Sequence, residues 1–281
     1  MRRGIYRLGA IALTMALVAG HLEGASVPNQ LIERVEQKDW DVIPRMPNAG
    51  PDTVDALEQL ASSSDQEVRE LVLWCLNEVG GAKARSVFLR ALHDSNEDVR
   101  DRAITFMHRH HDVADVRPLL KEVMGHTDDY IREQAALIVG EIGQASAMQG
   151  LRHADNATQH RQVSRAIQLA LARLGDQQSR QVFFKEFENP SVKQALQALK
   201  DFTYIRDPRE AARLLPLLSD SREALNVGPS HVPYVIRVCD VTVTVADILL
   251  QHPFAFDGRE QRRYTDEELS AARQIVRSRQ R

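Results

Sequence analysis

The chain has 281 residues, of which 43% are hydrophobic, 27% are charged and only 5% are aromatic, and its formal net charge is −3. A chain of this length and apolar content can bury a large core, so it is not disordered as a whole, and two cysteines cannot make a disulfide scaffold. The acidic balance argues against a nucleic-acid binder, and the scarcity of aromatic residues argues against a large β-sandwich.

The N-terminal segment has the pattern of a signal peptide. Three arginines precede an apolar run from Leu8 to Ala19, and small residues at its end place the expected cleavage near Gly20. The run is shorter than the roughly 20 residues of a stable membrane span, and His21 stands where a lipoprotein would need cysteine. We therefore expect residues 1–20 to be removed and the mature protein to be periplasmic or secreted. Retention of the leader as a membrane tether is the alternative.

A repeat of 29 to 32 residues organises the chain beyond the leader. In each unit a valine or isoleucine follows a polar turn, and the residues four, seven and eleven positions later are mostly apolar, which marks one face of an α-helix. In three units the residue twelve positions later is the glycine of a left-handed helix stop. These recurring residues are Val68, Val99, Ile131, Val163 and Val192, with Gly80, Gly143 and Gly175 as the stops.

A shorter amphipathic segment accompanies each of these helices, at 84–92, 113–123, 145–151 and 179–187. Antiparallel helix pairs at this period bury their apolar faces only by stacking on their neighbours. The sequence therefore predicts an all-α fold, a right-handed α-solenoid of about six helix pairs with a C-terminal capping helix. Arginines one residue after the anchor can bridge to acidic side chains of neighbouring turns, so we interpret them as structural rather than catalytic. They are Arg69, Arg100 and Arg132.

The stretch from Asp128 to Gly143 resembles a short HEAT repeat of the phycobilisome-lyase type, and Glu67 to Arg69 and Asp98 to Ala103 resemble the same element. The resemblance covers residues 52–203 clearly and residues 207–250 weakly. It implies the solenoid fold, but HEAT-like repeats occur in enzymes, scaffolds and adaptors alike. The iron-dependent hydroxylase of this family uses repeated His-Glu pairs, and none of the ten histidines here precedes a glutamate. An exported chain does not suit the bilin lyases, which work inside photosynthetic cells.

The period weakens towards the C-terminus. We expect Arg209 to Leu218 to be the first helix of a sixth pair and 219–233 to be an irregular insertion, either a functional loop or a spacer. Residues 234–250 are expected to be helical, and a capping signature at Thr265 predicts a final helix over 265–278. The expected organisation is a signal peptide at 1–20, a linker with a short helix at 21–51, the solenoid at 52–250 and a capping segment at 251–281.

The two cysteines are expected to be separate buried residues. Cys75 belongs to the first clear repeat and Cys239 to the last, and both stand in apolar helical stretches. Packed helices are about 10 Å apart, whereas a disulfide needs Cα atoms within about 7 Å. We therefore predict no intramolecular disulfide.

The densest group of titratable residues is the histidine cluster around His108 and His111, whose spacing on a helix can share a metal ion. The residues also lie at a repeat's helix end, where protonated histidines suit the helix dipole, and we favour that interpretation. The sequence carries no phosphate-binding glycine loop, nucleophile elbow or Cys-x-x-Cys pair. We predict no catalytic residues, no metal and no cofactor.

The remaining candidate site is a polar stripe on the second helix of each pair, which lines the concave side of most solenoids. The stripe passes from acidic to basic along the array, and it is either a solvated face or a groove for a partner. Its residues are Glu70, Arg102, His108, Arg109, Gln134, Glu141, Arg165 and Arg173, with Asn77 beside them. A mixed pattern of charge suits a protein or peptide partner better than a polyanion.

These observations favour a monomeric, exported, non-catalytic scaffold or adaptor that binds another protein through its concave face. One alternative is an enzyme, including a lyase-like protein, whose site lies between the concave face and the 219–233 loop. Another is an envelope-structure protein that associates with itself. No nucleic-acid binding and no stable membrane span after signal cleavage are expected.

Overall fold

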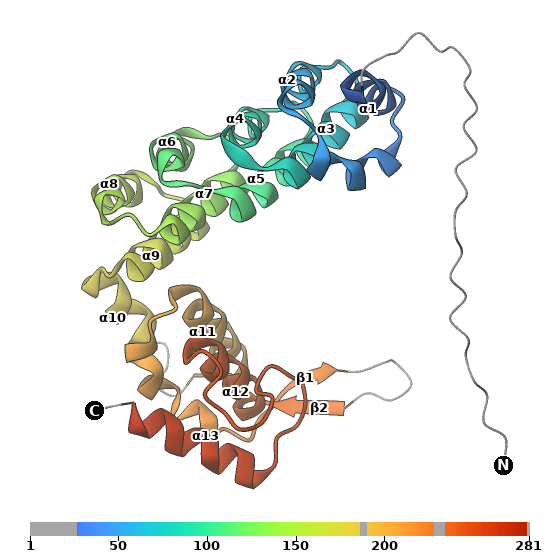
Figure 1. Ribbon diagram of the computed structural model, residues 1–281. Coiled ribbons are helices and arrows are strands. Elements are labelled where there is room, and N and C mark those ends of the chain that lie inside the picture. Colours follow the sequence, from blue (N-terminus) through green and yellow to red (C-terminus); the bar gives the residue numbers. More distant parts are fainter. Residues whose placement is uncertain (1–26, 186–189, 228–233, 280–281) are drawn as a thin grey trace, which may run out of the picture.

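The computed structural model describes residues 27–185, 190–227 and 234–279, and these form two rows of helices that curve into an open C (Figure 1). The signal peptide expected at residues 1–20 lies outside the described residues. One row holds five helices of 14 residues each, namely α3 (Gln66–Val79), α5 (Glu97–His110), α7 (Asp129–Ile142), α9 (Arg161–Leu174) and α11 (Val192–Ile205). They are the helices that the repeat predicts, and they line the inner side of the C.

The inner helices begin and end as their sequences predict, except at Gly80, which ends α3 with φ 68° and ψ −163° instead of the predicted left-handed helical conformation. Asp65, Asn96 and Asp128 cap α3, α5 and α7, because each side chain accepts a hydrogen bond from a backbone N–H of the first turn. Gly143 and Gly175 end α7 and α9 in the left-handed conformation. The repeated valine or isoleucine near each start is at most 5% exposed in the first four helices. The expected core face is therefore confirmed.

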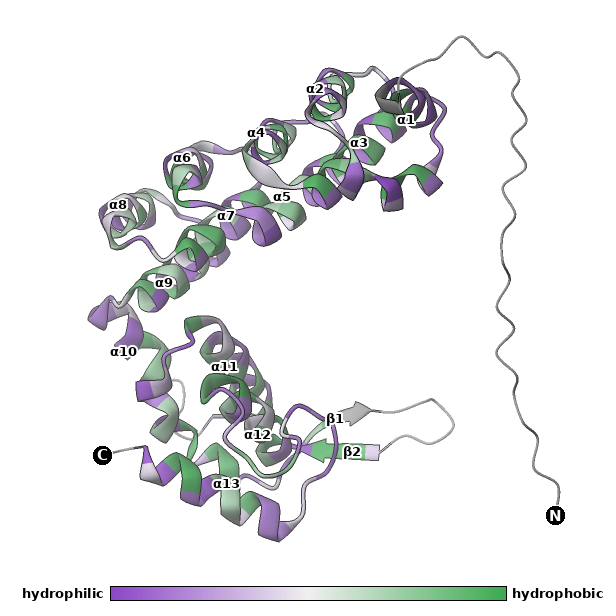
Figure 2. Ribbon diagram, in the orientation of Figure 1, coloured by the Kyte–Doolittle hydropathy of each residue, from purple (hydrophilic) through white to green (hydrophobic). Residues whose placement is uncertain are grey.

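The outer row contains the shorter partner of each pair. These helices are α2 (Pro51–Leu60), α4 (Gly81–Ala91), α6 (Val116–Gly125), α8 (Met148–Ala157) and α10 (Gln177–Lys185). Short 3-10 turns, η2 (Val113–Asp115) and η3 (Ala145–Ala147), lead into α6 and α8. Hydrophobic and hydrophilic residues share the helices of both rows (Figure 2), as expected of amphipathic helices that bury one side. The all-α solenoid predicted from the sequence is the observed fold.

The expected arginine ladder joins successive repeats on the turns. Arg69 donates two hydrogen bonds to Asp94, at 2.7 and 2.8 Å, and Arg100 pairs with Asp128 at 3.4 Å. Arg132 departs from this pattern, because it binds Asp129 of its own helix and the hydroxyl of Thr158 in the next turn. These guanidinium groups hold neighbouring turns together, which is the structural role assigned to them from the sequence.

The segment before the first repeat is more than a linker. Helix α1 (Val27–Glu36) and the 3-10 helix η1 (Trp40–Asn48) pack on α3, and Val35, Val42 and Met46 are completely buried. They cover the apolar end that the first repeat would otherwise expose to water.

The sixth helix pair expected from the sequence is absent from the described residues, which instead form two 3-10 helices and a β-hairpin before α12. The segment 209–218 forms two 3-10 helices, η4 (Pro208–Leu214) and η5 (Leu217–Ser219), instead of an α-helix. Pro216 separates them, and proline cannot donate the backbone hydrogen bond that an α-helix needs. Residues expected as an irregular insertion and the start of a helix form a β-hairpin. Its antiparallel strands are β1 (Glu223–Val227) and β2 (Tyr234–Arg237), and α12 (Val238–Leu249) follows directly.

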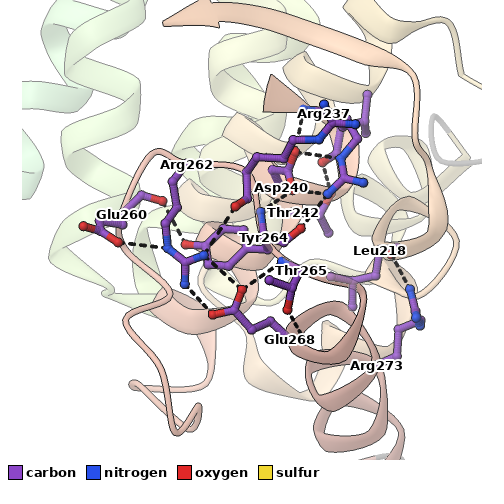
Figure 3. A network of polar contacts seen from close by, with 12 residues as sticks. Leu218, Arg237, Asp240, Thr242, Glu260, Arg262, Tyr264, Thr265, Glu268 and Arg273 are labelled. Atoms are coloured by element: carbon purple, nitrogen blue, oxygen red, sulfur yellow. Dashed lines mark hydrogen bonds and ion pairs between the residues drawn. The ribbon is translucent and has the colours of Figure 1, made fainter. Parts of the chain in front are cut away.

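The C-terminal helix closes the array as predicted. α13 (Asp266–Ser278) starts with a capping box in which Thr265 and Glu268 bind each other's backbone. A network of polar contacts fixes the segment that precedes α13 (Figure 3). The carboxylate of Asp240 accepts hydrogen bonds from Arg237 and from the backbone of Tyr264, and Arg262 binds Glu268. Burial raises the pKa of Asp240, but hydrogen bonds to its carboxylate outweigh burial and hold the pKa below its usual value.

Two apolar cores lie in the two arms of the C. The first runs from Leu31 to Leu171 and the second from Phe184 to Val276. A small cluster of Leu169, Ala172, Phe183 and Ile205 lies between them. The bend between α9 and α11 in Figure 1 coincides with this thin apolar bridge.

The cysteines are unpaired and buried, as the sequence analysis predicts: Cys75 is fully buried, and Cys239 is 2% exposed. Among the residues that the structure describes, no helix has both the length and the apolar character required to cross a bilayer.

Candidate functional site

At the acidic end of the polar stripe, side chains of neighbouring repeats contact each other. Glu70 on α3 and Arg102 on α5 form an ion pair at 3.4 Å, and the guanidinium of Arg102 lies 4.7 Å from the centre of the Trp74 ring. Both side chains are only partly exposed. Arg102 therefore has a packing role in addition to its charge.

The middle of the stripe is organised by His108. One ring nitrogen lies 2.9 Å from Glu141 and the other lies 3.0 Å from Gln134, so the imidazole of α5 binds two side chains of α7. Burial lowers the pKa of His108, but the hydrogen bond and charge of Glu141 outweigh burial and hold the pKa above its usual value. Burial likewise raises the pKa of Glu141, and the contacts with His108 more than compensate and lower it. His111 lies farther away, 3.9 Å from Glu141.

The basic end of the stripe contacts α11. Arg165 forms an ion pair with Asp201, whose side chain is almost fully buried, and its guanidinium lies 5.1 Å from the centre of the Phe183 ring. Arg173 donates a hydrogen bond to the carbonyl oxygen of Tyr204 and stacks on the ring of the same residue. Both arginines of α9 therefore help to hold the two arms together.

The structure thus brings the predicted residues into contacts between neighbouring inner helices. Arg109 is the exception, because its side chain is exposed and forms no hydrogen bond or ion pair with the described part of the chain. The stripe is a row of contacts between repeats, and Arg109 is its member most available to a partner.

A depression of about 570 Å³ lies where the C-terminal ends of the inner helices meet. Side chains of α5, α7, α9 and α11 line it, together with the residue that ends α11. They are His108, His111, Glu141, Arg173, Lys200, Thr203, Tyr204 and Arg206. Three of these residues, His108, Glu141 and Arg173, belong to the stripe predicted from the sequence, whereas Lys200 and Arg206 were not predicted. The available signal for Lys200 was its place on the last repeat helix, whereas Arg206 lies two residues beyond the position of the glycine stop, which Tyr204 occupies in this repeat.

A second depression, of about 610 Å³, lies between the first turns of α9 and α11. Arg161, Arg165 and Lys193 line it together with three glutamines. The inner face of the last two repeats is therefore richer in basic than in acidic side chains, which agrees with the acidic-to-basic gradient read from the sequence.

Three potential metal ligands, His93, Glu122 and His126, have ligand atoms within 4.8 Å of one another. These three residues form no recognisable motif in the sequence, because His93 lies on the turn of a different repeat. His126 already uses both ring nitrogens: Nδ1 accepts from the backbone N–H of Asp128 at 2.9 Å, and Nε2 lies 2.8 Å from the carbonyl oxygen of Leu92. Nε2 must therefore carry the proton, and the ring has no free lone pair for a metal. These residues fit a hydrogen-bonded turn better than a metal site.

The match to a family model agrees with the geometry. A family model of HEAT repeats matches residues 41–107 and 86–172. The chain is similar to a solved structure described as the complex of CpcE and CpcF of phycocyanin lyase from a Nostoc species, with 13% sequence identity and a TM-score of 0.47. That similarity covers 94% of this chain and 100% of the other. No curated protein matches the chain. The match to HEAT repeats covers residues 41–172, and the fold of the described chain is an all-α solenoid.

Proposed function

We propose that this protein is a monomeric, exported scaffold that binds another protein on the inner face of the C. The observation that carries the proposal is the row of inner helices α3, α5, α7, α9 and α11, whose side chains are fixed by contacts from one repeat to the next. A face held in this way presents its remaining polar groups with little loss of conformational entropy on binding. HEAT repeats are compatible with this role, since each repeat adds to one continuous surface.

A non-catalytic role is supported by the state of the titratable groups on this face. His108 is bound to Glu141 and Gln134, and in the described part of the chain no serine, threonine or cysteine hydroxyl or thiol is hydrogen-bonded to it. A histidine acting as a general base needs such a nucleophile, or a substrate proton, within hydrogen-bond reach. The arrangement supports a docking face rather than a reaction centre.

Export is proposed from the leader alone. The test is fractionation of the natural host followed by N-terminal sequencing of the protein. The expected mature chain starts near His21 and lies outside the cytoplasm. A chain that starts at Met1 and stays in the cytoplasmic fraction contradicts this part of the proposal.

The docking face is tested by chemical crosslinking in the host followed by purification of the tagged protein. The variant Arg109→Glu with Arg161→Glu reverses two exposed cations of the inner face that make no hydrogen bond or ion pair within the described chain. The matched control is Arg117→Glu with Lys121→Glu on the outer helix α6, where both side chains are likewise exposed. We expect a specific crosslinked partner with the natural chain and the control, and its loss with the inner-face variant. Equal capture by all three proteins rules out the inner face as the docking surface.

A further inference from the structure

We propose that the depression at the C-terminal ends of the inner helices binds carboxylate side chains from an acidic segment of the partner protein. The inference rests on the proposed scaffold function and specifies the chemistry of what it holds. The depression is lined by three permanent cations, Arg173, Lys200 and Arg206, and by one carboxylate, Glu141. That carboxylate is already bound by His108, so it neutralises the cations only in part.

Two of these cations are available to a ligand. Lys200 and Arg206 are exposed, and the side chain of neither forms a hydrogen bond, ion pair or ring contact with any residue in the described part of the chain. Basic side chains elsewhere are often paired, as Arg69 is with Asp94 and Arg262 with Glu268. A pair of unneutralised cations in one concave site attracts an anion, because the potentials of both charges add there.

The backbone conformation of Arg206 also supports a binding role for its side chain. Arg206 ends α11 with φ 52° and ψ 37°, in the left-handed conformation where α7 and α9 have Gly143 and Gly175. Glycine adopts this conformation without strain, whereas a residue with a Cβ atom is strained there. The chain therefore has a guanidinium at the edge of the depression in a backbone position that suits glycine better.

A simpler explanation is that the cations only stabilise the negative ends of the helix dipoles. That explanation accounts for a cation at Arg206 but predicts no effect of the side chain on binding. It also predicts that replacing Arg206 lowers stability. Binding and stability must therefore be measured on the same variants.

The size and charge of the site favour a short acidic peptide segment over a long polyanion. A volume of about 570 Å³ accommodates a few side chains rather than a nucleic-acid helix. Glu141 lies within the site, and the whole chain has a net charge of −3, so a long polyanion would meet repulsion beyond the depression.

The experiment measures fluorescence anisotropy of a labelled octaglutamate peptide titrated with the mature protein at low salt. The variants are Lys200→Glu and Arg206→Gly, and the matched control is Lys121→Glu on the outer helix α6. We expect saturable binding to the natural chain and the control, and affinity at least about tenfold weaker for Lys200→Glu. Arg206→Gly should also weaken binding while the thermal midpoint stays unchanged or rises, which the helix-dipole explanation does not predict.

Three results overturn the inference. The natural chain does not bind the peptide, both pocket variants bind it as tightly as the natural chain does, or the Lys121→Glu control loses as much affinity as the pocket variants do. Tighter and equally pocket-dependent binding of inorganic polyphosphate would also overturn it, because the site would then select phosphate rather than peptide carboxylates. The crosslinking experiment separates this failure from failure of the scaffold function. If the partner is still captured while octaglutamate does not bind, only the pocket chemistry is wrong.

Discussion

The hydroxyl of Tyr204 on α11 donates a hydrogen bond of 2.5 Å to the carbonyl oxygen of Leu137 on α7. The two helices belong to repeats that are not adjacent, since α9 lies between them in the row. Burial of the ring raises the pKa of the Tyr204 hydroxyl, so it stays a donor over the whole physiological range. This contact crosses the bend, and both residues pack against the small apolar cluster between the two cores.

The close approach at this contact depends on a glycine in the middle of α7. A Cβ atom at Gly140 would meet the Tyr204 hydroxyl and lie 2.9 Å from Cα of Ala170. Alanine normally stabilises a helix interior by about 1 kcal/mol relative to glycine. We expect Gly140→Ala to lower the free energy of unfolding by about 1–2 kcal/mol instead, because overpacking costs more than propensity gains. Urea denaturation followed by circular dichroism measures the change.

The control for this substitution is Gly125→Ala at the end of α6. A Cβ atom there meets nothing within 4 Å, so the substitution should be neutral or slightly stabilising. If Gly140→Ala were as stable as Gly125→Ala, the steric interpretation of the bend would be wrong.

A buried ion pair also holds the bend. Arg180 on α10 and Asp207, which caps η4, lie 2.7 Å apart, and their side chains are only 7% and 6% exposed. Hydrogen bonds from Arg209 lower the pKa of Asp207 to about 2. Burial of the carboxyl opposes this shift, and the charge of Arg180 adds to it. We expect Asp207→Asn to lower the free energy of unfolding by about 3 kcal/mol, because a buried guanidinium loses its counter-charge. Thermal denaturation at neutral pH measures this loss.

Arg209 provides the comparison, since it binds the same carboxylate from an 80% exposed position. We expect Arg209→Gln to have little effect on stability, because water screens an exposed pair. An equal loss in both variants would show that the exposed arginine, and not Arg180, stabilises Asp207.

The His108–Glu141 pair predicts a pH-dependent contribution to stability. The pKa of His108 is raised above 6.5, so its contribution is complete below pH 6.5 and is lost as pH rises through the raised value. The pKa of Glu141 is lowered below 4.5, so its contribution is present above pH 4.5 and is lost as pH falls further. The stability difference between the natural chain and His108→Gln should therefore be largest between pH 4.5 and 6.5.

Urea denaturation at about pH 5.5 and about pH 8.5 tests this expectation. The matched control is His153→Gln on α8, since the side chain of His153 is exposed and has no hydrogen bond or ion pair within the described chain. A His108→Gln difference that is as large at the higher pH as at the lower one contradicts the assignment of a charged pair.

Arg206→Gly separates stability from binding. Glycine removes the left-handed strain at the end of α11 but gains conformational freedom in the unfolded chain. We expect the free energy of unfolding to stay constant or to rise by up to about 1 kcal/mol, while affinity for an acidic peptide falls. A combined measurement of denaturation and anisotropy on one preparation checks both. A clear loss of stability with unchanged affinity would assign Arg206 to the helix end alone.

The repeat helices could be predicted because their signal is local and recurs. A buried valine near each start and a glycine stop such as Gly143 are enough to set the period and the core face. The hairpin could not be predicted in the same way. β2 is only four residues long, and its pairing with β1 depends on a contact across a loop that carries no helical or strand periodicity.

The candidate site was predictable in position but not in detail. Helical spacing correctly placed Arg102 and Arg165 on inner helices, but it could not show that Glu70 and Asp201 already bind them. Those partners lie 32 and 36 residues away in sequence. Which cations remain unpaired is decided by tertiary packing, and Lys200 was therefore found only from the structure.

The division into two cores has a consequence for the order in which the protein is made. All apolar residues of the first core lie between Leu31 and Leu171, so synthesis completes this core before the second, which extends to Val276. The N-terminal arm therefore emerges first, at the ribosome and again on the far side of the membrane if the chain is exported, and it can bury its side chains before the second arm is complete. Tyr204 lies later in the chain than the whole first core, so its contact with Leu137, which spans the bend, can form only after that core has been synthesised.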